Sequence, residues 1–120
     1  MPNPVVHWEI MSHDKSKGEE LQRFYSELFS WKIDADNPYS YGQVNTQTDR
    51  GINGAVGPSE GVSRVSIYVE VDDLQATLDK AVSLGATVAM PVTEIPGAVT
   101  MAMFTDPDGN FTGIIKGGSA

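Results

Sequence analysis

The chain has 120 residues and a formal net charge of -8 at pH 7, and it contains no cysteine. The length suits a single domain, the absence of cysteine excludes disulfides and thiol chemistry, and the negative charge argues against nucleic acid or an anionic membrane as a partner. Apolar runs stay well short of the ~20 residues of a membrane span, and the first residues lack a signal-peptide pattern, so we expect a cytoplasmic protein.

The first half of the chain predicts one helix among short strands. Residues 5–10 alternate between two faces, as a strand does. Residues 15–29 carry apolar side chains at helical spacing, namely Leu21, Phe24, Tyr25 and Leu28. Short strands are expected at 31–33, 41–46 and 52–56, separated by Asn-Pro and Asp-Arg-Gly.

The second half predicts the same order of elements. Residues 66–71 alternate, and Asp72 or Asp73 can cap a following helix that Gly85 ends. Further strands are expected at 87–92, 99–105 and 111–116. Each half is therefore predicted as β-α-β-β-β.

The two halves also match each other directly. Residues 5–10 overlay residues 66–71, and residues 45–56 overlay residues 104–115 without a gap. Two copies are too few for a solenoid, which needs about three. The repeat predicts an α+β fold of two tandem βαβββ modules related by a pseudo-two-fold axis, with a curved mixed sheet around one cleft.

The module boundaries are expected at about 4–58 and about 64–117 within one domain. Strand alternation then assigns a set of side chains to the cleft: Val5, His7, Glu9, Ile52, Val56, Ser66, Tyr68, Glu70, Met101, Met103, Phe111 and Ile115. The opposite face should cover the helices with Val6, Trp8, Ile10, Ile67, Val69 and Val71. An apolar cup with a few hydrogen-bonding groups is typical of a small-molecule site, although plain core packing is the alternative.

Four stretches of the sequence resemble the vicinal oxygen chelate superfamily, which includes glyoxalases, bleomycin-resistance proteins and extradiol dioxygenases. They are Val-His-Trp-Glu-Ile, Phe-Tyr-Ser-Glu-Leu-Phe-Ser-Trp-Lys, Tyr-Val-Glu-Val-Asp-Asp-Leu and Phe-Thr-Asp-Pro-Asp-Gly-Asn, at 6–10, 24–32, 68–74 and 104–110. The resemblance extends over residues 5–116. It implies the duplicated fold, but this fold hosts isomerases, epimerases, dioxygenases, thiol transferases and drug-binding proteins.

The resemblance also implies a place for a divalent metal, held by four side chains on the first and last strands of the modules. Carried over position by position, these are His7, Gly54, Tyr68 and Gly113. Only His7 is an ordinary ligand, whereas an open catalytic zinc site needs about three protein ligands. We therefore expect no metal and no cofactor, with a rebuilt site of His7, Glu9 and Glu70 as the alternative.

These observations favour a protein that binds a small organic ligand and, as the resemblance implies, forms a homodimer. The expected ligand-binding residues are His7, Glu9, Tyr68, Glu70, Met103 and Phe111. We expect Tyr68 and His7 to orient the ligand, with the His7 pKa near its ordinary value of about 6.5. The alternatives are a metal-dependent lyase, isomerase or dioxygenase, and a partner or regulatory module without catalysis.

Overall fold

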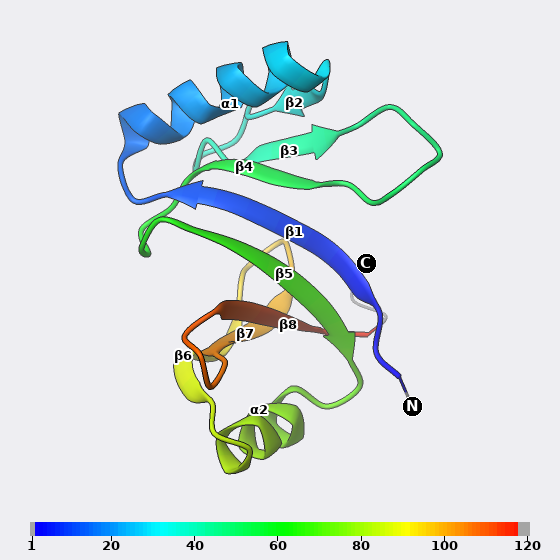
Figure 1. Cartoon of the computed structure of the whole chain (residues 1–120), viewed down its shortest axis with the longest axis vertical. Coiled ribbons are helices and arrows are strands. Elements are labelled where there is room, and N and C mark those ends of the chain that lie inside the picture. The colour runs from blue at the N-terminus through cyan, green and yellow to red at the C-terminus, as the bar shows by residue number, and fades with distance from the viewer. Residues whose placement is uncertain (1, 118–120) are drawn as a thin grey trace. The chain divides into compact units, whose positions relative to one another are not determined.

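The structure, a computed structural model, describes residues 2–117 and divides them into two compact units. The N-terminal unit holds residues 7–65, and the C-terminal unit holds residues 66–117 together with residues 2–6. The elements follow the order β-α-β-β-β twice, which confirms the predicted α+β duplication (Figure 1). Helices long and apolar enough to cross a bilayer are absent from residues 2–117.

The first β-α-β-β-β series builds a four-stranded sheet with one helix. Its elements are β1 (Val5–Ser12), α1 (Lys15–Phe29), β2 (Lys32–Asp34), β3 (Gly42–Asn45) and β4 (Gly54–Pro58). The strand order is β2-β3-β4-β1, in which β1 runs parallel to β4 and the other pairs are antiparallel. The parallel pair joins the first and last strands of the series, and its register positions the site described below.

Helix α1 begins and ends where the sequence predicts. The Asp14 side chain accepts a hydrogen bond of 2.9 Å from the Lys17 backbone N–H and so caps the first turn. Ser30 ends the helix in the left-handed conformation, with φ of 59°.

The face that α1 turns to the sheet differs from its apolar stripe. A Cβ on Gly18 would lie 2.6 Å from Pro58 Cα, so the helix meets β4 closely at this residue. One turn on, the Gln22 side chain donates to the Val56 carbonyl at 2.8 Å. Gly18 and Gln22 thus lie against β4, whereas Phe24 and Leu28 of the apolar stripe are 52% and 57% exposed.

The second β-α-β-β-β series repeats this plan. Its elements are β5 (Arg64–Val71), α2 (Leu74–Ser83), β6 (Thr87–Glu94), β7 (Thr100–Thr105) and β8 (Phe111–Lys116). The strand order is β5-β8-β7-β6, with β5 parallel to β8 and the other pairs antiparallel. Asp73 caps α2 by accepting from the Ala76 N–H at 3.0 Å, and Gly85 follows the helix with φ of 108°.

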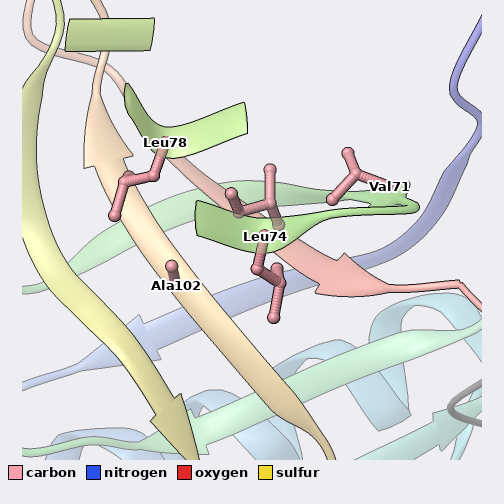
Figure 2. Close-up of a cluster of buried hydrophobic side chains, with 5 residues drawn as sticks. Val71, Leu74, Leu78 and Ala102 are labelled. Atoms are coloured by element: carbon pink, nitrogen blue, oxygen red, sulfur yellow. The ribbon is translucent and has the colours of Figure 1, made fainter. Parts of the chain in front are cut away.

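The core of the C-terminal unit lies between α2 and its sheet. Five side chains there are at most 5% exposed: Val71, Leu74, Leu78, Ala102 and Ile114. Figure 2 shows Leu78 of α2 above the strand that carries Ala102. Val69 also packs against this cluster, which confirms that Val69 and Val71 cover a helix. Burial of each leucine contributes about 1.5–3 kcal/mol.

Candidate functional site

In the C-terminal unit, an aromatic ring covers a glycine of the last strand. Tyr68 of β5 pairs with Gly113 of β8. A Cβ built on Gly113 would overlap the Tyr68 ring and would lie 2.9 Å from its Cζ atom. The phenol therefore fills the space that a side chain at position 113 would occupy.

The N-terminal unit contains the same arrangement with a different residue. Glu9 of β1 pairs with Ala55 of β4, which places Trp8 beside Gly54. A Cβ built on Gly54 would overlap the Trp8 indole. Trp8, and not His7, is thus equivalent to Tyr68, and the predicted overlay of the first strands is wrong by one residue.

These pairings decide whether the chain can hold the divalent metal of the superfamily at the usual positions. The four positions are Trp8, Gly54, Tyr68 and Gly113. They supply an indole, a phenol and no imidazole or carboxylate, whereas such metals need about three N or O ligands. In each unit the ring also occupies the space of the missing second ligand. Across residues 2–117, no three His, Asp or Glu side chains cluster as a metal site. The residues present do not fit the metal.

The indole of Trp8 instead forms the wall of a groove of about 470 Å³ in the N-terminal unit. The lining residues are Trp8, Ile10, Trp31, Thr46, Thr48, Arg50, Gly51, Ile52 and Val65. We call this surface the tryptophan groove. The expectation that Trp8 and Ile10 cover α1 is wrong, because the one-residue shift turns them to the other face of β1.

Two of the residues that line the tryptophan groove are tryptophans in contact with each other. The rings of Trp8 and Trp31 have centroids 5.3 Å apart and are inclined at 45°. Trp8 Nε1 donates to the Ile52 carbonyl at 3.0 Å, which fixes the indole against the loop before β4. On the helix side, Tyr25 stacks on Trp31 at 5.9 Å, and Phe29 lies 5.0 Å from it. The aromatic surface is thus held in place before a ligand arrives.

A second groove, of about 610 Å³, lies at the start of α1. Its lining combines apolar side chains with charged ones of both signs: Met11, Ser12, His13, Asp14, Lys17, Glu20, Leu21, Phe24 and Ser63. His13 Nδ1 and Ser63 Oγ are 3.0 Å apart, and both side chains are exposed. Lys17 and Glu20 pair with each other at 3.6 Å. The mixed charges are already paired or capping, so this groove makes the weaker candidate.

A polar network surrounds Glu9, which is only 7% exposed. The Tyr41 hydroxyl donates to Glu9 Oε2 at 2.7 Å. Tyr41 Oη also lies 2.7 Å from His7 Nε2, and since its single proton goes to Glu9, it accepts from the Nε2–H of His7. Arg64 Nη2 stands 3.7 Å from Glu9 Oε1. The imidazole of His7, the phenol of Tyr41, the carboxylate of Glu9 and the guanidinium of Arg64 thus follow one another in a continuous series of polar contacts.

The network changes the expected titration of His7. Burial lowers the pKa of the His7 imidazole below its ordinary value, and the nearby Glu9 carboxylate opposes this shift only partly. The expectation of a pKa near about 6.5 is therefore wrong. His7 favours the neutral form as a hydrogen-bond donor to Tyr41.

The other predicted ligand residues lie in the C-terminal unit. Tyr68 and Met103 are both 4% exposed, and the Tyr68 hydroxyl donates to the Met103 sulfur at 3.8 Å. Phe111 packs against this cluster, whereas Glu70 is bound through its backbone N–H to the Pro4 carbonyl at 2.9 Å. Tyr68, Met101, Met103, Phe111 and Ile115 do share one cluster, as alternation predicts. Their contact with a ligand stays a prediction.

Sequence reasoning missed four side chains that the structure brings into these sites: Trp8, Trp31, Tyr41 and Arg64. For Trp31 the available signal is the aromatic Phe-Ser-Trp-Lys stretch, which also carries the family resemblance. Tyr41 and Arg64 meet Glu9 from 32 and 55 residues away in the chain, at 2.7 and 3.7 Å. Local patterns carry no signal for such contacts.

Comparison with known proteins agrees with this fold. A sequence family described as a glyoxalase-like domain matches residues 11–115. "Putative glyoxylase CFP32" of Mycobacterium tuberculosis (strain CDC 1551 / Oshkosh) and of Mycobacterium bovis (strain ATCC BAA-935 / AF2122/97) is 35% identical over 115 residues. The match covers 88% of this chain and 42% of those relatives, so the chain spans less than half of their length.

Solved structures show the same fold at low sequence identity. A glyoxalase/bleomycin resistance protein/dioxygenase superfamily member from Vibrio splendidus 12B01 superposes with a TM-score of 0.61 at 16% identity, covering 96% of this chain and 99% of that one. Methylmalonyl-CoA epimerase from Mycobacterium tuberculosis superposes with a TM-score of 0.61 at 10% identity, covering 93% and 86%. At such identities the likeness concerns the fold and leaves the chemistry open.

Proposed function

This chain belongs to the glyoxalase-like domain family, and we propose that it binds a small planar organic molecule in the tryptophan groove without a metal ion. The observation that carries the proposal is the position of Trp8. Where the superfamily uses a metal ligand, this chain places an indole over Gly54 and makes it the wall of a groove. The relatives and the solved neighbours support the fold, and the groove supports the binding role.

The chemistry of the groove suits a planar ligand. Its volume of about 470 Å³ lies within the usual range of about 300–1,000 Å³ for small-molecule sites. The two indoles offer stacking surface, and Thr46 and Thr48 add hydroxyl groups to the lining. Because Tyr25 and Phe29 already fix Trp31, little side-chain freedom is lost when a ligand binds.

The two tryptophans make the test direct. They are the only tryptophans of the chain, and both line the groove. A ¹⁵N-labelled sample therefore shows two indole N–H signals, and both should shift when a neutral two-ring compound such as 2-naphthamide is titrated in. Trp8→Leu should weaken binding by about fivefold or more, because the stacking surface is lost.

A matched control is Tyr39→Leu, which removes a ring that is 74% exposed and does not line the groove. This variant should bind as the wild type does. Two results would overturn the proposal: a panel of two- and three-ring aromatic compounds that moves neither indole signal, or binding that appears only when a divalent metal is added.

A further inference from the structure

One positive charge stands at the tryptophan groove of a strongly negative protein. Arg50 is the only charged residue among the nine that line the groove, and the whole chain carries a net charge of -8. Within the part of the chain that the structure describes, Arg50 forms no salt bridge with a carboxylate. An exposed guanidinium beside two indoles is thus available to a ligand.

The loop that carries Arg50 is tied to the groove by its own hydrogen bonds. The Asn53 side chain accepts from the Thr46 N–H at 3.1 Å, which closes the loop between β3 and β4. The Arg50 N–H donates to Thr48 Oγ1 at 2.9 Å. Two residues further on, the Ile52 carbonyl accepts from the Trp8 indole at 3.0 Å. The same loop therefore positions both the cation and the ring that a ligand would contact.

We propose that the tryptophan groove selects planar aromatic compounds that carry an anionic group such as a carboxylate. The ring would lie on Trp8 and Trp31, and the carboxylate would reach the guanidinium of Arg50, which can donate two parallel hydrogen bonds. This inference rests on the proposed function. It adds the charge of the ligand, which the groove would recognise through its one cationic side chain.

The overall negative charge of the protein works against this selection. A net charge of -8 repels anions at a distance, so the preference must come from contact at Arg50 and not from long-range attraction. A cationic aromatic compound would meet an unpaired guanidinium at the groove and should bind less well than a neutral one. Contact recognition of this kind predicts a preference that shrinks as salt is added.

The test compares 2-naphthoate with 2-naphthamide, which share the ring system and differ in charge. Isothermal titration calorimetry at low salt should give a Kd for the carboxylate about three- to fivefold lower than for the amide, the range expected of an exposed ion pair. Arg50→Gln should remove this difference, because the carboxylate loses the guanidinium that it contacts. Arg50→Lys should retain part of the difference, since the charge remains without the fork of donors.

The matched control is Arg23→Gln, which removes an exposed arginine from α1 that does not line the groove. It should keep the wild-type preference. Equal Kd values for the two compounds in the wild type, or an unchanged preference in Arg50→Gln, would overturn the charge selection while the binding function stands. If neither compound nor any other planar aromatic binds, both the inference and the proposed function are wrong.

Discussion

The two carboxylate oxygens of Glu9 have different partners in the N-terminal unit. Oε2 accepts from the Tyr41 hydroxyl at 2.7 Å, and Oε1 lies 3.7 Å from Arg64. The Arg64 side chain is 11% exposed and also donates to the Val62 carbonyl at 3.0 Å. Among residues 2–117 the buried Arg64 Nε atom has no hydrogen-bond partner. The ion pair with Glu9 therefore makes up only part of the free energy lost when both charges leave water.

Arg64→Met should lower the free energy of unfolding by about 2–4 kcal/mol, because it leaves the buried Glu9 charge without its cation. Chemical denaturation at pH 7 measures the change. Lys17→Met is the control, since Lys17 forms an exposed pair with Glu20, and its loss should cost about 0.5 kcal/mol or less. Similar losses in the two variants would show that burial does not strengthen the Glu9 pair.

The lowered pKa of His7 predicts a pH dependence of stability. The unfolded chain binds a proton at His7 near pH 6.5, while the folded chain resists it. The His7 contribution is therefore fully present above about pH 6.5 and is lost as the pH falls through the lower folded pKa.

Denaturant unfolding at several pH values between 7.5 and 5 tests this prediction. His7→Asn should reduce the loss of stability on acidification below about pH 6.5 relative to the wild type. His13→Asn, which changes the other histidine of the chain at an exposed position, is the control. A His7→Asn variant that loses stability with acid as steeply as the wild type contradicts the assignment.

At the scale of elements, the contact between α1 and β4 depends on a missing side chain. Gly18 is buried within the helix, and a Cβ there would lie 2.6 Å from Pro58 Cα and 2.7 Å from the Gly57 carbonyl carbon. Both neighbours are backbone atoms and cannot turn away. The helix keeps glycine, despite its low helix propensity, because the close approach requires it.

Gly18→Ala should therefore destabilise the protein by about 1–3 kcal/mol, although the same change in an exposed helix stabilises by about 0.5–1 kcal/mol. Thermal and denaturant unfolding measure it. Ser16→Ala, at an exposed position of the same helix, is the control and should change stability by less than about 0.5 kcal/mol. A stabilising effect of Gly18→Ala would show that α1 does not press against β4.

For the whole molecule, the residues at the four metal positions cannot hold a divalent ion. We therefore expect the melting temperature to be the same with and without divalent ions. Anything that binds the folded state stabilises it, so a resident metal would make the melting temperature depend on its removal. Treatment with EDTA, followed by zinc, manganese or iron(II), should shift the melting temperature by less than about 1 °C. Elemental analysis that finds one metal per chain, together with a lower melting temperature after EDTA, would contradict this prediction.

Association of the whole chain with a second copy stays a prediction from the family resemblance. Sedimentation equilibrium over a range of concentrations tests it directly. A monomer at the highest concentrations would remove the homodimer and would leave the tryptophan groove unaffected, since all nine lining residues belong to the N-terminal unit.

The order of elements, the bounds of α1 and the family are predictable from the amino-acid sequence alone. Residues 15–29 and 111–116 are predicted with the observed bounds. The sequence offers Asp72 or Asp73 as the cap of α2, and the structure has Asp73; Gly85, the expected end of the helix, follows Leu84 with positive φ. These features depend on neighbours in the chain: alternation along a strand, a capping carboxylate, a glycine that accepts positive φ. Features that depend only on neighbouring residues can therefore be predicted from the sequence.

The face of β1 that contributes to a site becomes visible only in the folded chain. A strand presents alternate residues to opposite faces, so a one-residue error in the overlay exchanges His7 for Trp8 and changes the predicted contacts of both. The register depends on the pairing of Glu9 with Ala55, 46 residues later, and the aromatic-over-glycine contact follows from it. Such long-range pairing leaves no local pattern, which is why the tryptophan groove and the Tyr41–Glu9–Arg64 contacts could be found only in the folded chain.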